Sequence, residues 1–173
     1  MVDVYIGVGS NIEPERHLRL AVDALEARFG PIRCSSVYRS PAFGFCGADF
    51  LNMVCAFSTD RGADDIEREL HDIEYEGGRL RRAERFSSRT LDLDLLLFGE
   101  AVDAPRRLPR SDVLRYPFVL APLAELAPAL RHPLTGASLA DEWRVMQGRG
   151  GVVLERVGSC RPGVSGGPGV RAL

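Results

Sequence analysis

The acidic residues Asp92 and Asp94 are the feature of this chain best suited to chemistry. They lie in the segment TLDLDLLLF, residues 90–98, where leucines alternate with the two acids. A strand with this period of two places both carboxylates on one exposed face, with Cα atoms about 6.5 Å apart. Carboxylates this close repel each other unless a cation lies between them. The pattern therefore predicts a Mg²⁺ site, because this hard cation binds one or two carboxylates together with phosphate oxygens, and a carboxylate pair can bridge two metal ions.

An arginine-rich segment comes directly before the acidic strand. Its members are Arg79, Arg81, Arg82, Arg85 and Arg89. A pair of acids or a run of arginines, taken alone, is most often a solvated surface. The apolar run 95–98 that follows the acids, however, is typical of a central, buried strand. Together the buried strand, the acids and the arginines predict a site for a metal–polyphosphate complex.

Composition and charge limit the class of protein. The 173 residues are 45% hydrophobic and 27% charged, which is typical of one soluble globular domain. The net charge is −2 and the pI is near 5.9, so no basic field indicates nucleic acid as a partner. No apolar run reaches the roughly 18 residues of a membrane span, and the N-terminal MVDVYIGVGSN lacks the basic start of a signal peptide. We therefore expect a cytoplasmic protein without a membrane partner.

The basic residues are all arginines: the chain has 22 of them and no lysine. Because P-loop enzymes and protein kinases each need a lysine on the phosphates, both classes are excluded. Schiff-base chemistry is excluded for the same reason. Cysteines and histidines offer only weak signals for zinc or a catalytic thiol, since neither a CxxC spacing nor a histidine at ligand spacing occurs. These residues are Cys34, Cys46, Cys55, Cys160, His17, His71 and His132.

The hydrophobic pattern predicts an α+β fold. Strands are expected at 2–8, 32–38, 50–58 and 90–98, and helices at 13–29 and 63–75. This β-α-β-β-α-β order is ferredoxin-like, with two helices on one face of a mainly antiparallel sheet. Additional C-terminal helices are expected at 119–126 and 137–146. Residues 148–173 are glycine-rich and contain too few apolar side chains to pack, which predicts one domain at 1–147 and a disordered tail.

Several motifs together resemble the 6-hydroxymethyl-7,8-dihydropterin pyrophosphokinases, a family of the folate pathway. The matching pieces run in the family's order over about residues 2–130, and GRxRxxER followed by RTLDLD is the most specific of them. They are Gly9-Ser10-Asn11, Tyr38-Arg39-Ser40-Pro41, Phe50-Leu51-Asn52, Glu74 with Gly78-Arg79, 81–85, 89–94 and 118–128. The resemblance implies transfer of pyrophosphate from ATP to the hydroxymethyl group of the pterin, which yields AMP and the pterin diphosphate.

The resemblance also implies a role for each residue of the site. Asp92 and Asp94 would hold two Mg²⁺ ions, and Arg79 and Arg89 would steady the charge of the transferring group, so these four are the implied catalytic residues. The implied contacts to the co-substrate ATP are Glu74, Arg79, Arg81, Arg89, Leu95, Arg110, Arg115 and Tyr116. The implied pterin contacts are Ser40, Pro41, Phe43, Phe50, Asn52, Asp92 and Phe118. Among them, the Asn52 amide can both donate to and accept from the amino-oxo edge of the pterin, and the aromatic rings can stack on it.

Three positions differ from the family's usual pattern. Pro109-Arg110-Ser111 stands where the family usually has Pro-His-Pro, Tyr116 stands where it usually has arginine, and Phe86 replaces a frequent tryptophan. Arg110 keeps a positive donor, and Arg115 lies one residue before the position of the usual arginine. We expect these two arginines to supply the phosphate contacts.

Two alternatives to an active pyrophosphokinase fit parts of this pattern. One is a degenerate family member that binds the pterin with weak or no ATP turnover, which the differences in the ATP-binding residues would allow. The other is a ferredoxin-like nucleic-acid-binding module, but Asp92 and Asp94 on the sheet face would repel phosphate in the absence of metal. The expected partners are the two small-molecule substrates, without nucleic acid, bound by a monomer.

Overall fold

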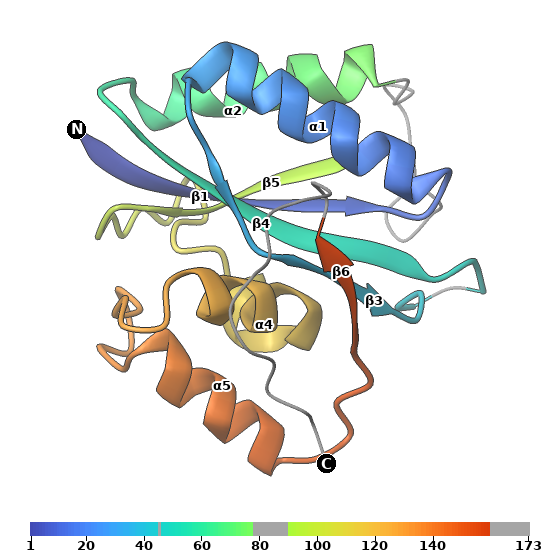
Figure 1. Ribbon diagram of the computed structural model, residues 1–173. Helices are drawn as coiled ribbons and strands as arrows, with labels where there is room; N and C mark the ends of the chain where they lie inside the picture. The colour runs from blue at the N-terminus through green and yellow to red at the C-terminus, as the bar shows by residue number, and fades with distance from the viewer. Residues whose placement is uncertain (45, 78–89, 160–173) are drawn as a thin grey trace.

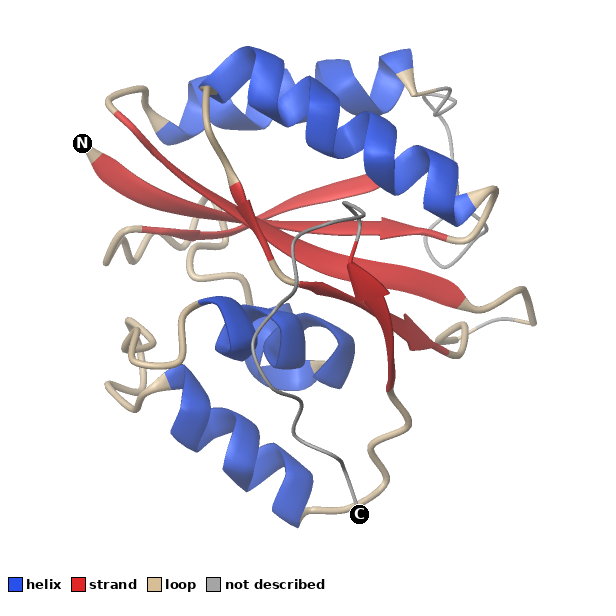
Figure 2. Ribbon diagram, in the orientation of Figure 1, coloured by secondary structure: helices blue, strands red, loops and turns tan. Residues whose placement is uncertain are grey.

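A six-stranded sheet lies between two layers of helices (Figures 1 and 2). The computed structural model describes residues 1–44, 46–77 and 90–159. Its strands are β1 (Val2–Ser10), β2 (Arg33–Cys34), β3 (Ser36–Ser40), β4 (Phe50–Thr59), β5 (Asp92–Phe98) and β6 (Glu155–Ser159). Its helices are α1 (Pro14–Phe29), α2 (Ala63–Glu76), α3 (Asp112–Arg115), α4 (Pro117–Leu126) and α5 (Leu139–Gly148). Helices α1 and α2 cover one face of the sheet, whereas α4 covers the other and α5 packs against α4 (Figure 1).

The order of the strands is β5-β1-β4-β3-β6, with β2 also paired to β4. Each of these pairings is antiparallel. The unit formed by β1, α1, β3, β4, α2 and β5 is the ferredoxin-like β-α-β-β-α-β arrangement that the sequence predicts, and this prediction is confirmed. Strand β1 lies between β4 and β5, so residues near its end can contribute to a site together with both neighbours.

Two apolar cores stabilise the sheet between its helices. The first lies under α1 and α2, and it includes Leu91, Leu93 and Leu95 from the acidic segment. Each buried leucine contributes about 1.5–3 kcal/mol relative to exposure in water. Because successive strand residues point to opposite faces, Asp92 and Asp94 lie on the other face, which α4 covers. The acids are therefore half-buried, not on the fully exposed face that the sequence predicts.

The alternation along β5 ends after the acids. Leu96 and Leu97 both belong to the second core, which packs against α4 and α5. Two successive strand residues can share a core here because the pairing of β1 with β5 shifts register between Tyr5 and Ile6. Leu96 and Leu97 therefore pack against the helices, whereas Asp92 and Asp94 stay half-buried.

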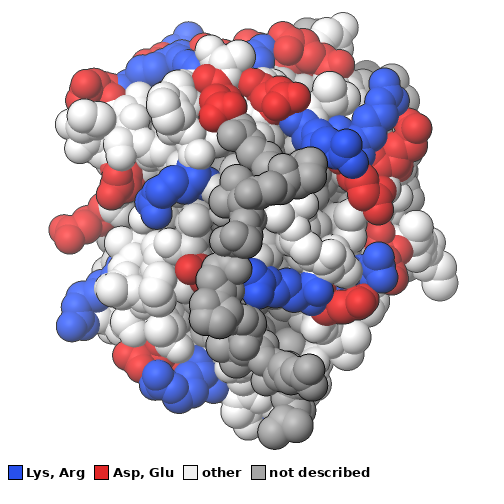
Figure 3. Space-filling model, in the orientation of Figure 1, with Lys and Arg blue, Asp and Glu red and all other residues white. Residues whose placement is uncertain are grey.

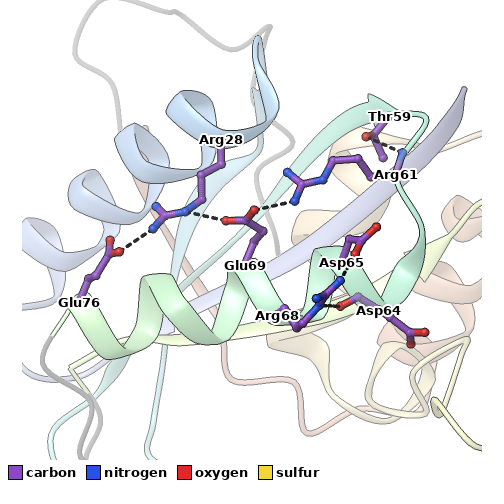
Figure 4. Close-up of polar contacts among 8 residues, drawn as sticks. All are labelled: Arg28, Thr59, Arg61, Asp64, Asp65, Arg68, Glu69 and Glu76. Carbon is purple, nitrogen blue, oxygen red and sulfur yellow. Dashed lines mark hydrogen bonds and ion pairs between the residues drawn. The ribbon is translucent and has the colours of Figure 1, made fainter.

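Ion pairs join α1 and α2 above the first core (Figure 4). Arg28 of α1 contacts Glu69 and Glu76 of α2 at 3.0 and 2.7 Å. Arg61, in the turn after β4, reaches the second oxygen of Glu69 at 2.5 Å. Isolated surface pairs contribute about 0–1 kcal/mol each, but a shared carboxylate holds several side chains at once. The cluster thus fixes the two helices relative to the sheet that they cover.

Strand β6 corrects the prediction of disorder for part of 148–173. Its residues pair with β3 although all five are exposed. Backbone pairing with an open sheet edge needs no apolar side chains, and polar contacts support it: Arg156 donates to Ser36 Oγ at 2.7 Å, and Arg39 pairs with Glu155 at 3.1 Å. Residues 160–173 lie outside the described residues, so their disorder stays a prediction.

Smaller differences concern where elements begin and end. The strand expected at 32–38 is divided at Ser35, whose N–H donates to the Val54 carbonyl and whose Oγ accepts from the Val54 N–H, both at 2.9 Å. Helix α1 begins after Glu13, which occupies the N-cap position with a positive φ of 43°. Helix α4 continues through Pro122, and the short helix α3 was not predicted.

Charges on the described surface are mixed in sign. On the face that Figure 3 shows, arginines and acidic residues are interspersed over the described part of the molecule. None of the helices in the described ranges combines the length and apolar character needed to cross a bilayer.

Candidate active site

A pocket opens on the α4 side of the sheet, where β1, β4 and β5 run side by side. It is lined by Gly7, Val8, Gly9, Asn52, Met53, Val54, Asp92, Asp94, Leu96, Phe118 and Val119. Four residues proposed from the sequence meet here: Asn52 of β4, Asp92 and Asp94 of β5, and Phe118 of α4. An amide, an aromatic ring and two carboxylates can therefore act on one bound molecule.

Glycines of β1 form the floor of the pocket. Gly9 pairs with Asn52 on one side and with Asp92 on the other. A Cβ atom at Gly9 would lie 3.1 Å from Oδ1 of Asn52, and one at Gly7 would lie 3.3 Å from a methyl carbon of Leu96. Glycine weakens a strand, and in a strand interior it often marks a position that another group approaches closely. These two glycines keep the floor open between the amide and the acids.

The acids of the pocket interact electrostatically. The pKa of Asp94 is raised to about 7, mainly by burial and next by the negative charge of Asp92. Asp112 and Glu74 act in the same direction, whereas the guanidinium of Arg110 lowers the pKa of Asp94. Burial and the neighbouring carboxylates thus disfavour the ionised form of Asp94. A bound cation would relieve their repulsion.

Within the part of the chain that the structure describes, Arg110 forms an ion pair with Asp94. Its Nη2 lies 3.0 Å from Asp94 Oδ1, and its Nε donates to Asp112 Oδ2 at 2.8 Å. The backbone N–H of Arg110 donates to the Leu96 carbonyl at 2.9 Å, which fixes the loop beside β5. The guanidinium is therefore placed at the acidic pair by both its main chain and its side chain.

The donor set fits a hard divalent cation. Asp92 and Asp94 offer carboxylate oxygens only, which suit Mg²⁺. Within the described ranges, no group of three or more His, Cys, Asp and Glu side chains could enclose a metal ion. Asp92 and Asp94 would supply two carboxylates, and water and phosphate oxygens suit the other coordination positions of Mg²⁺.

Several residues predicted to bind the pterin lie around Asn52, which lines the pocket. The buried Asn52 donates from Nδ2 to Ser40 Oγ at 3.0 Å, so its side chain is held in place by β3. Phe50, two residues earlier on β4, lies on the same side, and a Cβ at Gly9 would be 4.0 Å from its ring. Pro41 follows Ser40 and is exposed. The structure therefore brings Ser40, Phe50 and Asn52 together as expected.

Three aromatic rings form a row that includes Phe118 of the pocket lining. Tyr116 stacks on Phe118 with centroids 5.0 Å apart and ring planes at 12°. Phe43, which is 53% exposed, meets Tyr116 edge-on at 5.2 Å. The guanidinium of Arg115 lies 5.3 Å from the centroid of the Tyr116 ring. Tyr116, predicted to contact ATP, thus has a clear second role as the support of Phe118.

Other residues proposed from the sequence lie apart from the pocket lining. Glu74 is buried in α2, where its Oε1 accepts from the Leu93 N–H at 2.8 Å and so ties α2 to β5. The Leu95 side chain belongs to the first core, on the opposite side of the sheet. Their contacts with ATP stay predictions. Arg79, Arg81 and Arg89 lie outside the described residues.

Some residues of the site were not proposed from the sequence. Gly7 was missed, although a second glycine two positions before Gly9 on a strand is a signal for a close approach. Asp112 was missed because nothing in the sequence indicates that it shares Arg110 with Asp94. That contact depends on the path of the loop after β5.

The fold and the pocket define a class: a ferredoxin-like α+β protein with a metal-competent carboxylate pair on its sheet. Over residues 5–128 the chain matches the family described as 7,8-dihydro-6-hydroxymethylpterin-pyrophosphokinase (HPPK), and it belongs to that family.

Curated relatives of the chain have names that agree with this family. The chain is 41% identical over 136 residues to the 2-amino-4-hydroxy-6-hydroxymethyldihydropteridine pyrophosphokinase of Pseudomonas aeruginosa, which covers 75% of this chain and 83% of the relative. The enzyme of the same name from Bacillus subtilis is 36% identical over 155 residues, covering 86% and 92%.

A solved structure shares the fold. The crystal structure of Plasmodium falciparum HPPK-DHPS has a TM-score of 0.68 and 11% identity, and the match covers 86% of this chain. It covers 45% of that protein, so the chain spans less than half of its length. At this identity the likeness concerns the fold alone.

Proposed function

We propose that this protein transfers pyrophosphate from ATP to the hydroxymethyl group of 6-hydroxymethyl-7,8-dihydropterin, a step of folate biosynthesis. The hydroxyl oxygen of the pterin attacks the β-phosphorus of ATP and loses its proton. The bond from this phosphorus to the oxygen that bridges to the α-phosphate breaks, and AMP leaves with the electron pair. The products are AMP and the pterin diphosphate.

One observation supports this function above the others: Asn52, Phe118 and the pair Asp92 and Asp94 line the same pocket. The amide can recognise the amino-oxo edge of a pterin, and the ring can stack on its plane. The carboxylates then lie on the side where a metal–polyphosphate would be. Membership of the family agrees with this division of the pocket.

On the pterin side, Asn52 orients the ring system, with Ser40 as the partner that holds its amide. Phe118 and Phe50 supply apolar faces, and Phe43 and Pro41 stand at the exposed rim. Holding the hydroxymethyl group in one orientation lowers the entropy cost of the transfer.

On the ATP side, Asp92 and Asp94 would hold two Mg²⁺ ions, which neutralise the phosphate oxygens and withdraw charge as the bond to AMP breaks. Arg110 and Arg115 are the described cations that would approach the phosphates. We keep Arg79, Arg81 and Arg89 as further proposed phosphate contacts, with Arg79 and Arg89 as charge stabilisers. Glu74, Leu95 and Tyr116 complete the proposed ATP contacts.

We further propose that a monomer suffices, because Asn52, Phe118 and the acidic pair already bring the proposed pterin and metal contacts into one pocket. We also propose a cytoplasmic location, where ATP is available to the reaction.

The decisive test is a coupled assay of AMP release with and without 6-hydroxymethyl-7,8-dihydropterin. We expect AMP release that depends on both the pterin and Mg²⁺. Asp92→Asn should abolish it, and Asp23→Asn, at an exposed position of α1, is the matched control that should not. If AMP release ignores the pterin, the proposal is wrong. If calorimetry shows pterin binding but no binding of an ATP analogue, the chain is a degenerate family member.

A further inference from the structure

The guanidinium of Arg110 is held between two carboxylates. Its Nη2 contacts Asp94 Oδ1 at 3.0 Å and its Nε contacts Asp112 Oδ2 at 2.8 Å. The side chains of Arg110, Asp94 and Asp112 are 31%, 33% and 26% exposed, so the cluster is neither fully buried nor freely solvated. Both acids are thus neutralised in part by one cation.

Asp94 is also a proposed metal ligand, and this creates a conflict. A divalent cation needs the negative oxygens of Asp94, and the guanidinium of Arg110 already engages one of them. Two positive groups on one carboxylate would repel each other at short range. The two cannot share Asp94 without a loss of affinity for one of them.

The backbone of Arg110 lets its side chain move while the residue stays in place. The N–H of Arg110 donates to Leu96 on β5 and its carbonyl accepts from the Val113 N–H, at 2.9 and 3.1 Å. Neither contact depends on where the guanidinium points. Asp112, in the first turn of α3, can keep hold of Nε while the other end of the guanidinium moves.

We infer that Arg110 and the divalent metal exchange at Asp94: without metal the guanidinium neutralises Asp94, and with the metal–nucleotide complex it leaves Asp94 and binds the polyphosphate. A guanidinium suits both positions because its fork of N–H donors matches carboxylate and phosphate oxygens alike. The inference rests on the proposed function for the identity of the nucleotide, but its first half concerns the metal alone. It gives Arg110 a positioning role that starts before ATP arrives.

The test measures Mn²⁺ binding without nucleotide, by electron paramagnetic resonance of the free ion, in wild type and Arg110→Ala. Removing the competing guanidinium should tighten Mn²⁺ binding by about three- to ten-fold, the range of a partly exposed ion pair with good geometry. Arg107→Ala removes a charge from an exposed position of the same loop, and its Mn²⁺ affinity should equal that of wild type. Cooperative thermal unfolding of both variants checks that both fold, and Arg110→Ala should melt slightly lower because it lacks the ion pair with Asp94.

A second measurement tests the other half of the exchange. Calorimetry with a non-hydrolysable ATP analogue and saturating Mn²⁺ should show weaker nucleotide binding to Arg110→Ala by about ten-fold or more, because a charge-assisted contact to phosphate is lost. Opposite effects on metal and nucleotide in one variant support the exchange. Unchanged or weaker Mn²⁺ binding overturns it, and so does unchanged nucleotide binding. Neither measurement depends on turnover, so failure of the proposed reaction would be recognised separately by the AMP assay.

Discussion

Replacing Asp94 by asparagine should separate what the acidic pair does for the reaction from what it costs the fold. The substitution keeps the shape of the side chain and removes its charge. Folding raises the pKa of Asp94 from 3.8 to about 7, mainly through burial and the charge of Asp92, so the ionised carboxylate destabilises the folded chain. At 1.36 kcal/mol per pH unit the full effect would be about 4 kcal/mol.

That figure must be reduced because a third of the Asp94 side chain is exposed and solvent screens it. We therefore expect Asp94→Asn to stabilise the protein by roughly 1 kcal/mol in the absence of metal, which corresponds to about 2–4 °C in Tm for a chain of this size. The pKa of Asp94 already includes the attraction of Arg110. The loss of this attraction in Asp94→Asn is therefore already contained in the expected stabilisation.

The stabilisation by Asp94→Asn should increase with pH. Because the pKa of Asp94 is raised on folding, the folded protein binds this proton more tightly than the unfolded chain between pH 3.8 and about 7. The contribution of Asp94 to stability falls as pH rises through this window, and the cost is fully present above it. Asp94→Asn should therefore raise Tm at about pH 8, and by less than half as much at about pH 5.

Scanning calorimetry in the presence of a chelator, at both pH values, measures this effect. The same scans with Mg²⁺ should stabilise wild type and leave Asp94→Asn unchanged, and the variant should show no pterin-dependent AMP release. A variant that is less stable than wild type at both pH values would refute the electrostatic reasoning. Near-wild-type turnover at moderate Mg²⁺ would refute the two-carboxylate site.

Further predictions concern other parts of the molecule. Gly9→Ala, whose Cβ would lie 3.1 Å from Asn52 Oδ1, should raise the KM for the pterin by about ten-fold with little change in Tm, measured by initial rates and melting. His132 is 2% exposed with an unpartnered Nε2, and burial lowers its pKa. As pH falls, the unfolded chain protonates His132 before the folded protein does, so the free energy of unfolding should decrease below about pH 6.5. Urea titrations at several pH values should show a smaller decrease for His132→Asn than for wild type. Cys34 Sγ lies 3.4 Å from Cys55 Sγ on paired strand positions. The azo oxidant diamide should therefore take two electrons and two protons from the two thiols and form one disulfide. A thiol titration should show the loss of two thiols, and Cys34→Ser should prevent this loss.

The core fold could be predicted from the sequence because each of its signals is local. Alternation of leucines and acids in 90–98 defines β5 and its two faces, and the spacing of apolar residues defines α1 and α2. The order of these elements then leaves few arrangements, of which the ferredoxin-like one is observed. The alternation in 90–98 also indicated the acidic pair, whereas Asn52 was proposed only through the family resemblance, and the structure shows that Gly9 pairs with both Asn52 and Asp92.

What could not be predicted depends on contacts between distant segments. Strand β6 exists because β3 leaves an open edge and because Arg156 reaches Ser36, 120 residues earlier. The burial of both Leu96 and Leu97 needs the register shift between β1 and β5. The contact of Arg110 with Asp94 requires the loop to return to β5, where the backbone of Arg110 bonds to Leu96. The hydrophobic periodicity of a single segment cannot predict such contacts between distant segments.

The energy that the acidic pair costs the fold is the same energy that favours the bound cation. Folding buries Asp94 and brings it close to Asp92 and Asp112, and the pKa of Asp94 is raised, first by burial and next by the charge of Asp92. A divalent cation relieves the repulsion between these carboxylates, so the repulsion that folding creates adds to the affinity for the cation. Arg110 lowers both the cost of the acidic pair to the fold and the affinity for the metal, since its contact with Asp94 stabilises the metal-free protein and competes with the metal. Substitutions that make this pocket more stable should therefore make it a weaker metal site, whereas changes in the distant cluster of Arg28 and Glu69 should alter stability alone.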